Sequence, residues 1–192
     1  MKTNDAKGAP RRPRVKKDDW LNAALKLLCE SGIESVRVEV LAARLSVAKS
    51  GFYYHFTNRE GLYDALLDHW NILDQEPNRT IDELSNLDPR DGLVAVIKMV
   101  DELDLGNMDF AIRQWAHRDK KVRKAYNKEV MVRLELNRTL FAMLGFKGDD
   151  LEMRTRVFVA YVTTERQVFP NLTNKERWKL RNLMIDTLLR RD

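Results

Sequence analysis

Side chains that could contact nucleic acid are concentrated in one short stretch of the sequence, KSGFYYHF at residues 49–56. Lys49 can reach a phosphate or a guanine edge, and the hydroxyl of Ser50 can bond to a base or a phosphate. Gly51 carries no side chain, which would let this backbone lie close to a duplex. These three neighbours predict contacts to DNA at the start of the stretch.

Aromatic residues occupy the rest of the same stretch. Tyr53, Tyr54 and His55 supply hydroxyl and imidazole groups that can donate hydrogen bonds to phosphate oxygens. Phe52 and Phe56 are spaced so that they can pack back against neighbouring helices. We therefore expect one face of the stretch to bind and the other face to anchor it.

Residues that could support catalysis or hold a metal are few. The three histidines, His55, His69 and His117, show no metal-ligand spacing, and the sequence contains neither a glycine-rich phosphate loop nor a nucleophile elbow. The single cysteine, Cys29, has apolar neighbours and is expected to be a small buried residue rather than a reactive thiol. We expect a protein that is not an enzyme and that uses no cofactor.

Two short helices are predicted to position the stretch, at residues 37–45 and 48–55. Only Ser46 and Val47 separate them, and a pair of helices joined so tightly is typical of a helix-turn-helix. In that motif the second helix enters the major groove with its N-terminal turn at the base edges. Since any trihelical core gives a similar pattern, the spacing alone leaves other folds open.

The chain as a whole is predicted to be all-α. From Trp20 onward apolar residues recur at helical spacing, and no run of strict alternation predicts a strand. The polar segment 74–88 is predicted to be a loop between two subdomains. Residues able to cap a helix N-terminus stand at Thr57, Asp88, Asp149 and Thr173. About nine helices are expected, at residues 18–31, 37–45, 48–55, 58–73, 89–104, 108–117, 120–144, 150–168 and 174–190.

Composition and charge limit the class of protein. The 192 residues are 44% hydrophobic, which is enough for a buried core, and no apolar run approaches the roughly 20 residues of a membrane span. We therefore expect a cytoplasmic protein with no membrane partner. The net charge of +5 is concentrated in residues 1–17, whose composition predicts a disordered basic arm. Such an arm either adds contacts to nucleic acid or only aids solubility.

Residues 18–70 resemble the DNA-binding domain of the TetR family of bacterial transcriptional regulators. The resemblance runs through Ala24, Leu28, Gly32, Val38, Leu41-Ala42, Val47, Phe52-Tyr53-x-His55-Phe56 and Arg59-Glu60-x-Leu62. It implies that DNA is contacted by Arg37, Lys49, Ser50, Gly51, Tyr53, Tyr54, His55 and Arg59. Lys49 to Gly51 would face bases. Tyr53 and His55 would hold the backbone, and Arg59 would meet a phosphate.

Several positions depart from the pattern of that family. The family usually has glycine where Ser46 stands, a hydroxyl residue where Ala48 stands, and glycine before Ser or Thr where Ser50-Gly51 stand. Because alanine cannot cap a helix, we expect either that Ser46 caps the helix 48–55 or that this helix starts less rigidly. Arg37 stands where the family often has a capping threonine.

The resemblance implies that residues 71–192 form a helical domain that binds a small-molecule effector and dimerises. Helices 150–168 and 174–190 are apolar on more than one face, and such a helix needs two partners. One partner would be the domain core, and the other would be the same pair of helices in a second subunit. A two-fold dimer also suits DNA, because it places two recognition helices on two half-sites.

The effector site is predicted from residue types. Methionine and aromatic side chains suit an adaptable apolar cavity, although each of them could equally be an ordinary core residue. Arg113 and His117 lie one helical turn apart and could meet an anionic ligand or form a solvated face. The candidate residues are Met99, Met108, Phe110, Arg113, Trp115, His117, Tyr126, Met131 and Tyr161.

The sequence thus predicts a basic arm at 1–17, a helix-turn-helix domain at 18–70, and a ligand-binding and dimerisation domain at 71–192. We expect a homodimeric, ligand-responsive transcriptional regulator, a repressor, that binds a palindromic double-stranded operator through helix 48–55. One alternative is a small-molecule or lipid carrier with a TetR-like fold that does not bind DNA. A second alternative is an architectural DNA-binding protein that has no effector.

Overall fold

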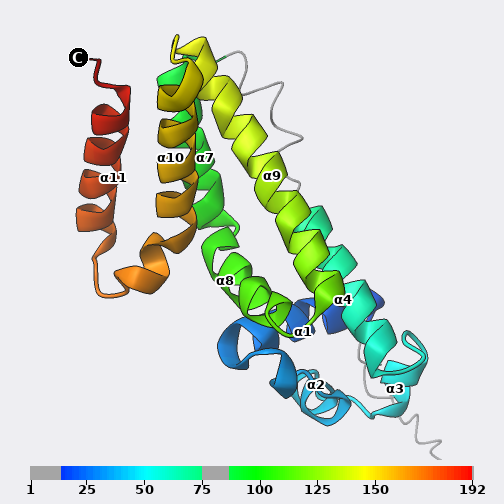
Figure 1. The fold of residues 1–192 in the computed structure, drawn as a ribbon. Helices are drawn as coiled ribbons and strands as arrows, with labels where there is room; N and C mark the ends of the chain where they lie inside the picture. The colour runs from blue at the N-terminus through cyan, green and yellow to red at the C-terminus, as the bar shows by residue number, and fades with distance from the viewer. Residues whose placement is uncertain (1–13, 75–86, 192) are drawn as a thin grey trace, which may run out of the picture.

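The computed structural model describes residues 14–74 and 87–191, which form helices joined by turns (Figure 1). Within these ranges no strand occurs, and each predicted helix is present with ends shifted by at most three residues, so the all-α prediction is confirmed. The helices are α1 (Lys17–Ser31), α2 (Val38–Arg44), α3 (Ser50–Tyr53), α4 (Arg59–Asp74), α7 (Pro89–Glu102), α8 (Leu105–Ala116), α9 (Lys120–Met143), α10 (Gly148–Val168) and α11 (Asn174–Leu189), with a 3-10 turn, η1 (Ile33–Ser35), after α1.

The caps of the helices explain where several of them begin. Asp88 caps α7 by accepting the N–H two residues on, and Thr173 caps α11 in a capping box, as predicted. The other two predicted caps are wrong. Asn58, one residue later than Thr57, accepts the N–H three residues on, at the start of α4. Asp149 lies inside α10, which already begins at residue 148.

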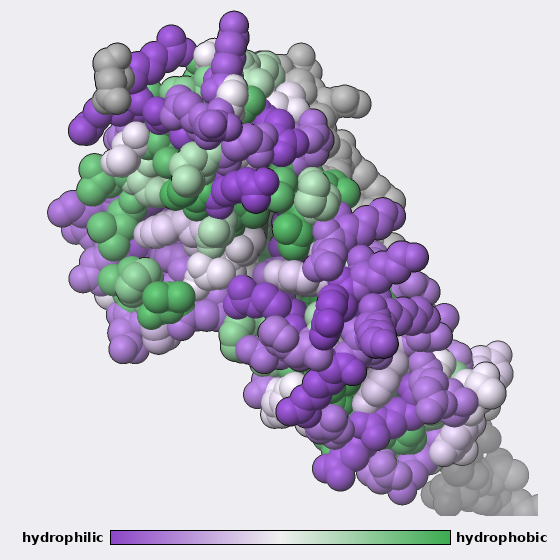
Figure 2. Space-filling view, in the orientation of Figure 1, coloured by the Kyte–Doolittle hydropathy of each residue, from purple (hydrophilic) through white to green (hydrophobic). Residues whose placement is uncertain are grey.

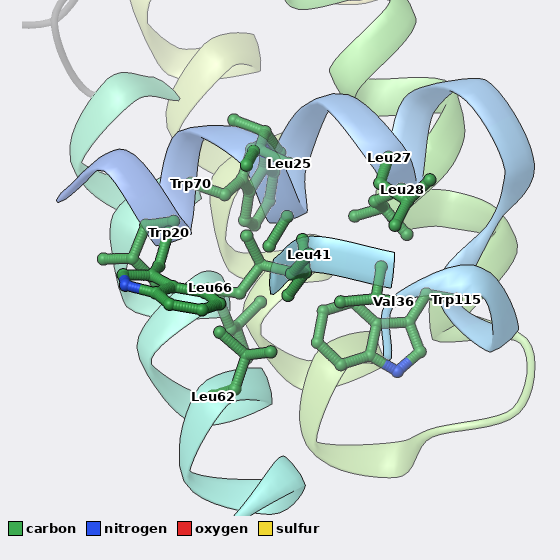
Figure 3. Packing of buried hydrophobic residues seen from close by; sticks show 14 of the residues in the cluster. Trp20, Leu25, Leu27, Leu28, Val36, Leu41, Leu62, Leu66, Trp70 and Trp115 are labelled. Atoms are coloured by element: carbon green, nitrogen blue, oxygen red, sulfur yellow. The ribbon is translucent and has the colours of Figure 1, made fainter. Parts of the chain in front are cut away.

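The first hydrophobic core holds α1, α2, α3 and α4 together (Figure 3). Trp20, Leu41 and Leu66 fill its centre and are at most 1% exposed. Phe52 attaches the short α3 to this core, because it is fully buried and meets the Trp20 ring edge-on at 5.7 Å. Burial of an aromatic side chain of this kind contributes about 1.5–3 kcal/mol, which a four-residue helix could not supply from its own backbone.

The second hydrophobic core lies between α7, the C-terminal half of α9, α10 and α11. Ile97, Phe141 and Phe158 are among its buried members. Gly92 permits the close approach of α7 and α9, because a Cβ atom at that position would stand only 3.0 Å from Leu140 Cδ2. This core holds together α7, α10, α11 and part of α9, which all lie in the segment 71–192 that is predicted to bind a ligand and dimerise.

The two cores are joined through α4, α8 and α9. Trp115 of α8 is buried in the first core and meets Tyr63 of α4 edge-on at 5.4 Å. Tyr126 of α9 stacks on Trp70 of α4 at 6.4 Å. The predicted division after residue 70 therefore falls inside α4, and α8 packs against α1 in the first core. Residues 1–13 of the predicted arm and 75–86 of the predicted loop lie outside the described residues.

Candidate nucleic-acid interface and internal cavity

The turn between α2 and α3 is built by a helix C-terminal motif with an unusual residue. The Ser46 N–H donates to Ala43 O at 3.1 Å, and the Val47 N–H donates to Ala42 O at 3.0 Å. This pair of bonds is the Schellman arrangement, which places one residue in the left-handed region and favours glycine there. Ser46 is that residue, with φ of +55°. The turn therefore adopts the geometry for which the TetR pattern provides glycine.

The start of α3 carries no side-chain cap. Lys49 occupies the N-cap position, and no side chain accepts a hydrogen bond from the first turn. The hypothesis that Ser46 caps this helix is wrong, because Ser46 ends α2 instead. The regular helix is accordingly shorter than the predicted range 48–55 and covers Ser50–Tyr53. Lys49 and Tyr54 keep right-handed helical dihedral angles at its two ends.

Four of the predicted DNA-contacting residues form one exposed surface on α3. Ser50 is exposed, and Tyr53 and Tyr54 are 63% and 69% exposed. The Lys49 ammonium group donates to a carboxylate oxygen of Glu39 at 3.0 Å, with both side chains largely in solvent. An ion pair so exposed is worth little, so a phosphate can compete for Lys49. This surface offers one cation and three hydroxyl groups to a ligand.

Two other predicted contacts face the protein instead of this surface. His55 is half-buried, and its Nε2 lies 3.3 Å from the carbonyl oxygen of Val15. A Cβ atom on Gly51 would meet the Trp20 ring at 3.6 Å, so that position points toward α1. Arg14 covers the Tyr54 ring at 4.2 Å. His55 therefore ties the residues that precede α1 to the end of α3, a role that its type and spacing alone do not indicate.

The two predicted arginine contacts stand at helix starts on either side of α3. Arg37 precedes α2, is exposed, and makes no cap hydrogen bond with its side chain. Arg59 begins α4, where its Nε donates to the Tyr63 hydroxyl at 2.6 Å and its Nη2 lies 3.8 Å from Glu34. The structure thus holds Arg59 in place through groups of its own chain while leaving it exposed.

An apolar cavity of about 40 Å³ lies between α7, α8, α9 and α10. Aliphatic and aromatic side chains form most of its wall, and Arg133, Asn137 and Thr163 add polar groups. None of the nine residues predicted for the effector site lines this cavity. Its walls come from Val96, Val100, Leu105, Arg133, Leu136, Asn137, Phe158, Val159, Val162 and Thr163.

The nine predicted effector residues are dispersed over the structure instead. Phe110 and Trp115 line an open groove between α8 and the end of α1. Arg113 lies 5.7 Å from the centre of the Phe110 ring. His117 and Met131 are exposed. The other four are half-buried beside one of the two cores or on α10: Met99, Met108, Tyr126 and Tyr161.

A buried polar cluster beside the cavity was not predicted from the sequence. Asp109 of α8 is only 2% exposed; it pairs with Arg133 and accepts a hydrogen bond from the Tyr126 hydroxyl at 3.2 Å. Burial, with the charge of Asp109 next, raises the pKa of Tyr126 to about 12, so the hydroxyl remains a donor. The sequence separations of 17 and 24 residues carry no periodic signal, which is why sequence patterns could not reveal the cluster.

A further apolar surface lies over α10 and α11. Figure 2 shows hydrophobic side chains gathered over these two helices. Met153 and Leu183 are 63% and 56% exposed, and Val157 and Leu180 are also exposed. Large apolar side chains grouped in this way mark an interaction surface.

The first part of the chain is similar to known bacterial regulatory proteins. Residues 21–66 match the model of the family described as bacterial regulatory proteins, tetR family. The tetracycline repressor protein class D of Escherichia coli is 36% identical over 53 residues, which are 28% of this chain and 24% of that protein. The class H repressor of Photobacterium damsela subsp. piscicida matches equally well. The chain thus matches about a quarter of the length of these relatives.

Solved structures share the fold over nearly the whole chain. A transcriptional regulator from Rhodococcus sp. Rha1 has a TM-score of 0.69 at 17% identity, over 90% of this chain and 95% of that one. FadR from Bacillus subtilis, in complex with stearoyl-CoA, has a TM-score of 0.65 at 19% identity, over 91% and 98%. AibR, in complex with isovaleryl coenzyme A and operator DNA, has a TM-score of 0.64 at 16% identity, over 90% and 95%.

Proposed function

We propose that this chain carries a DNA-binding domain of the TetR family of bacterial regulatory proteins and that it is a homodimeric, effector-responsive transcriptional repressor. The observation that carries the proposal is the exposed surface of α3, where Lys49, Ser50 and Tyr53 stand together within the matched residues. A protein that only carried small molecules would have no use for two tyrosines exposed beside a lysine on one short helix.

Sequence recognition is assigned to α3 and its flanks. Lys49 and Ser50 are placed to reach base edges, and Tyr53 and Tyr54 to bond to phosphates. Arg37 and Arg59 extend the same surface toward the phosphates on either side. His55 contributes indirectly, because its contact with Val15 O holds the residues just before α1 against the end of α3.

Dimerisation is assigned to the apolar surface over α10 and α11. Two copies of this surface can cover each other about a two-fold axis, since an isologous contact uses the same patch on both subunits. Covering Met153, Val157, Leu180 and Leu183 removes from water the large side chains that the single chain leaves exposed. The resulting dimer would present two α3 helices to two half-sites of a palindromic operator.

The cavity between α7 and α10 is the proposed effector site. FadR and AibR hold stearoyl-CoA and isovaleryl coenzyme A, so two regulators of this fold take up small molecules. At about 40 Å³ the cavity here has room for roughly three water molecules, so a larger ligand must move its walls apart. Ligand binding would thereby favour a different helix arrangement and shift the dimer away from operator binding.

Binding rather than catalysis is the proposed activity. Burial raises the pKa of the Cys29 thiol to about 11, so the thiol remains protonated and is a poor nucleophile. His55 is engaged with Val15 O, and His69 lies 2.9 Å from Asn22 Oδ1. Within residues 14–74 and 87–191, no helix is long and apolar enough to cross a membrane, and no acidic, histidine or cysteine cluster could hold a metal ion.

Selection of random DNA duplexes by the purified protein at physiological salt tests the proposal. We expect enrichment of a palindrome, which a symmetric dimer requires. Absence of enrichment from a folded dimer would instead favour the carrier alternative. Enrichment of DNA with no effect of any small molecule would favour the architectural DNA-binding protein.

Variants of α3 then locate the contact. Tyr53→Ala should lower operator affinity about tenfold or more, because it removes an exposed phosphate contact without opening the core. Met143→Ala is the matched control, since Met143 is also exposed but stands at the far end of α9 (Figure 1). Equal operator affinities of these two variants would contradict the assignment of α3.

A further inference from the structure

One of the residues that line the cavity between α7 and α10 carries a buried hydrogen-bond acceptor that has no partner. Asn137 lies in the wall and is 3% exposed. Its Nδ2 donates to Arg133 O at 2.8 Å, which fixes the orientation of the amide group. The Oδ1 atom is consequently turned away from that bond, and it is buried without a hydrogen-bond partner. A buried carbonyl oxygen without a hydrogen-bond partner is unfavourable, so a donor that reached it would be held.

The second uncharged polar group of the wall is also an acceptor. The Thr163 hydroxyl donates its hydrogen to Val159 O at 2.8 Å within α10. Its oxygen can therefore only accept a bond from a ligand. Asn137 and Thr163, which both line the cavity, thus use their donors on the protein backbone and keep only acceptors for a ligand.

The charged group of the wall is already neutralised. Arg133 pairs with Asp109, which is 2% exposed and cannot exchange its partner for water. An anionic ligand that took Arg133 would leave Asp109 as a buried charge without its charge partner, which is strongly unfavourable. A cationic ligand would lose its hydration among Val96, Val100 and Phe158 without a free counter-charge.

From these contacts we propose that the cavity binds a small, neutral, mainly apolar molecule that bears a hydroxyl or amide hydrogen-bond donor, and that the donor bonds to Asn137 Oδ1. This inference rests on the proposed function, because it names the chemical class of the effector. The apolar part of the ligand packs against the valine side chains of α7 and α10. The volume of about 40 Å³ favours a short molecule over a long acyl chain.

Two isomeric probes isolate the hydrogen bond from size and hydrophobicity. Butan-1-ol has a donor, whereas diethyl ether has the same composition and can only accept. Titration of each probe into the full-length protein with ¹³C-labelled valine methyl groups reports binding at Val96, Val100 and Val162. Butan-1-ol should bind about two- to tenfold more tightly than diethyl ether, the preference that one hydrogen bond provides. Butyrate should bind more weakly than either probe.

Asn137→Leu keeps the approximate volume of the side chain and removes the acceptor. In this variant the two isomers should bind equally, and diethyl ether should bind at least as well as it does to the wild-type protein. Thr163→Val serves as the comparison for the second acceptor and should reduce the preference less. Stronger binding of butyrate, equal binding of the isomers to the wild-type protein, or no methyl shift with any probe would overturn the inference. Operator selection by the same protein is unaffected by these outcomes, so failure here is separable from failure of the proposed function.

Discussion

Replacement of Ser46 with glycine should stabilise the protein without touching its core. Ser46 is exposed and has φ of +55°, in the left-handed region that residues with a Cβ atom rarely adopt. The hydrogen bonds that define this conformation run through the backbone of residues 42 to 47 and do not need the serine side chain. Glycine can therefore keep the turn and relieve the steric cost.

The size of the effect follows from two opposing terms. A residue with a Cβ atom pays roughly 1–2 kcal/mol in the left-handed region. Glycine loses about 0.5–1 kcal/mol more backbone entropy on folding than alanine does. The difference leaves a gain of about 0.5–1 kcal/mol in the free energy of unfolding. For a chain of this length, that gain corresponds to a rise of about 1–4 °C in Tm.

The chain supplies its own control at the end of α9. Gly145 has φ of +88°, and its N–H donates to Ala142 O at 2.8 Å, as the Ser46 N–H donates to Ala43 O. Gly145→Ala should destabilise by about 1 kcal/mol or more, because it creates the strain that Ser46→Gly removes. Ser46→Ala should leave Tm nearly unchanged, since alanine retains the Cβ atom. Thermal and urea unfolding followed by circular dichroism measure all three variants.

Two patterns of results would refute this reasoning. If Gly145→Ala is destabilising but Ser46→Gly leaves Tm unchanged, then the turn between α2 and α3 stores no strain. If Ser46→Gly and Ser46→Ala both lower Tm, the serine hydroxyl has a stabilising role that outweighs the backbone term. Either result would remove the physical reason for expecting glycine at this position.

Three further predictions concern packing, dimerisation and salt dependence. Gly92→Val should lower the free energy of unfolding in urea by about 1–3 kcal/mol, because its Cβ atom would stand 3.0 Å from Leu140 Cδ2. An unchanged midpoint of unfolding would show that α7 and α9 can separate freely. Leu183→Glu should convert the dimer to a folded monomer in sedimentation equilibrium, since Leu183 is 56% exposed on the proposed interface; a dimer of unchanged affinity would exclude this surface. Residues 1–13 contain four basic residues, and their deletion should flatten the slope of log affinity against log salt by up to about 3.6 per subunit. An identical slope would show that these residues make no DNA contacts.

Local signals in the sequence were sufficient to find the helices. Asp88 before Pro89 and the Thr173 box set the starts of α7 and α11, because a cap acts on its own first turn. The same signals misplaced the start of α4 by one residue, since Thr57 and Asn58 are both capable caps and only the backbone decides between them. The four exposed residues of α3 could be chosen from type and spacing, but the inward direction of His55 depends on Val15, 40 residues away.

The cavity could not be predicted, for a physical reason. Most of the residues predicted for the effector site are methionine or aromatic, and these side chains fill space, as Trp115 does within the first core and Met108 does against it. A cavity forms where facing side chains are too short to meet. Here the short side chains are those of Val96, Val100 and Val162. Which valines face one another depends on the packing of four helices, and no local pattern encodes it.

The two cores explain how a ligand in one could be sensed in the other. Arg133 lies in the cavity wall and is paired with Asp109 of α8, and Asp109 in turn holds the Tyr126 hydroxyl. Tyr126 stacks on Trp70, which is fully buried in α4, the helix that leads from the α3 surface. If the wall at Arg133 moves to admit a ligand, Asp109 must follow or lose its charge partner, because both are shielded from water. A ligand can shift the equilibrium toward a displaced α4 only by the free energy with which it prefers the expanded cavity over the closed one. Its affinity and its effect on operator binding therefore both depend on its contacts with this wall.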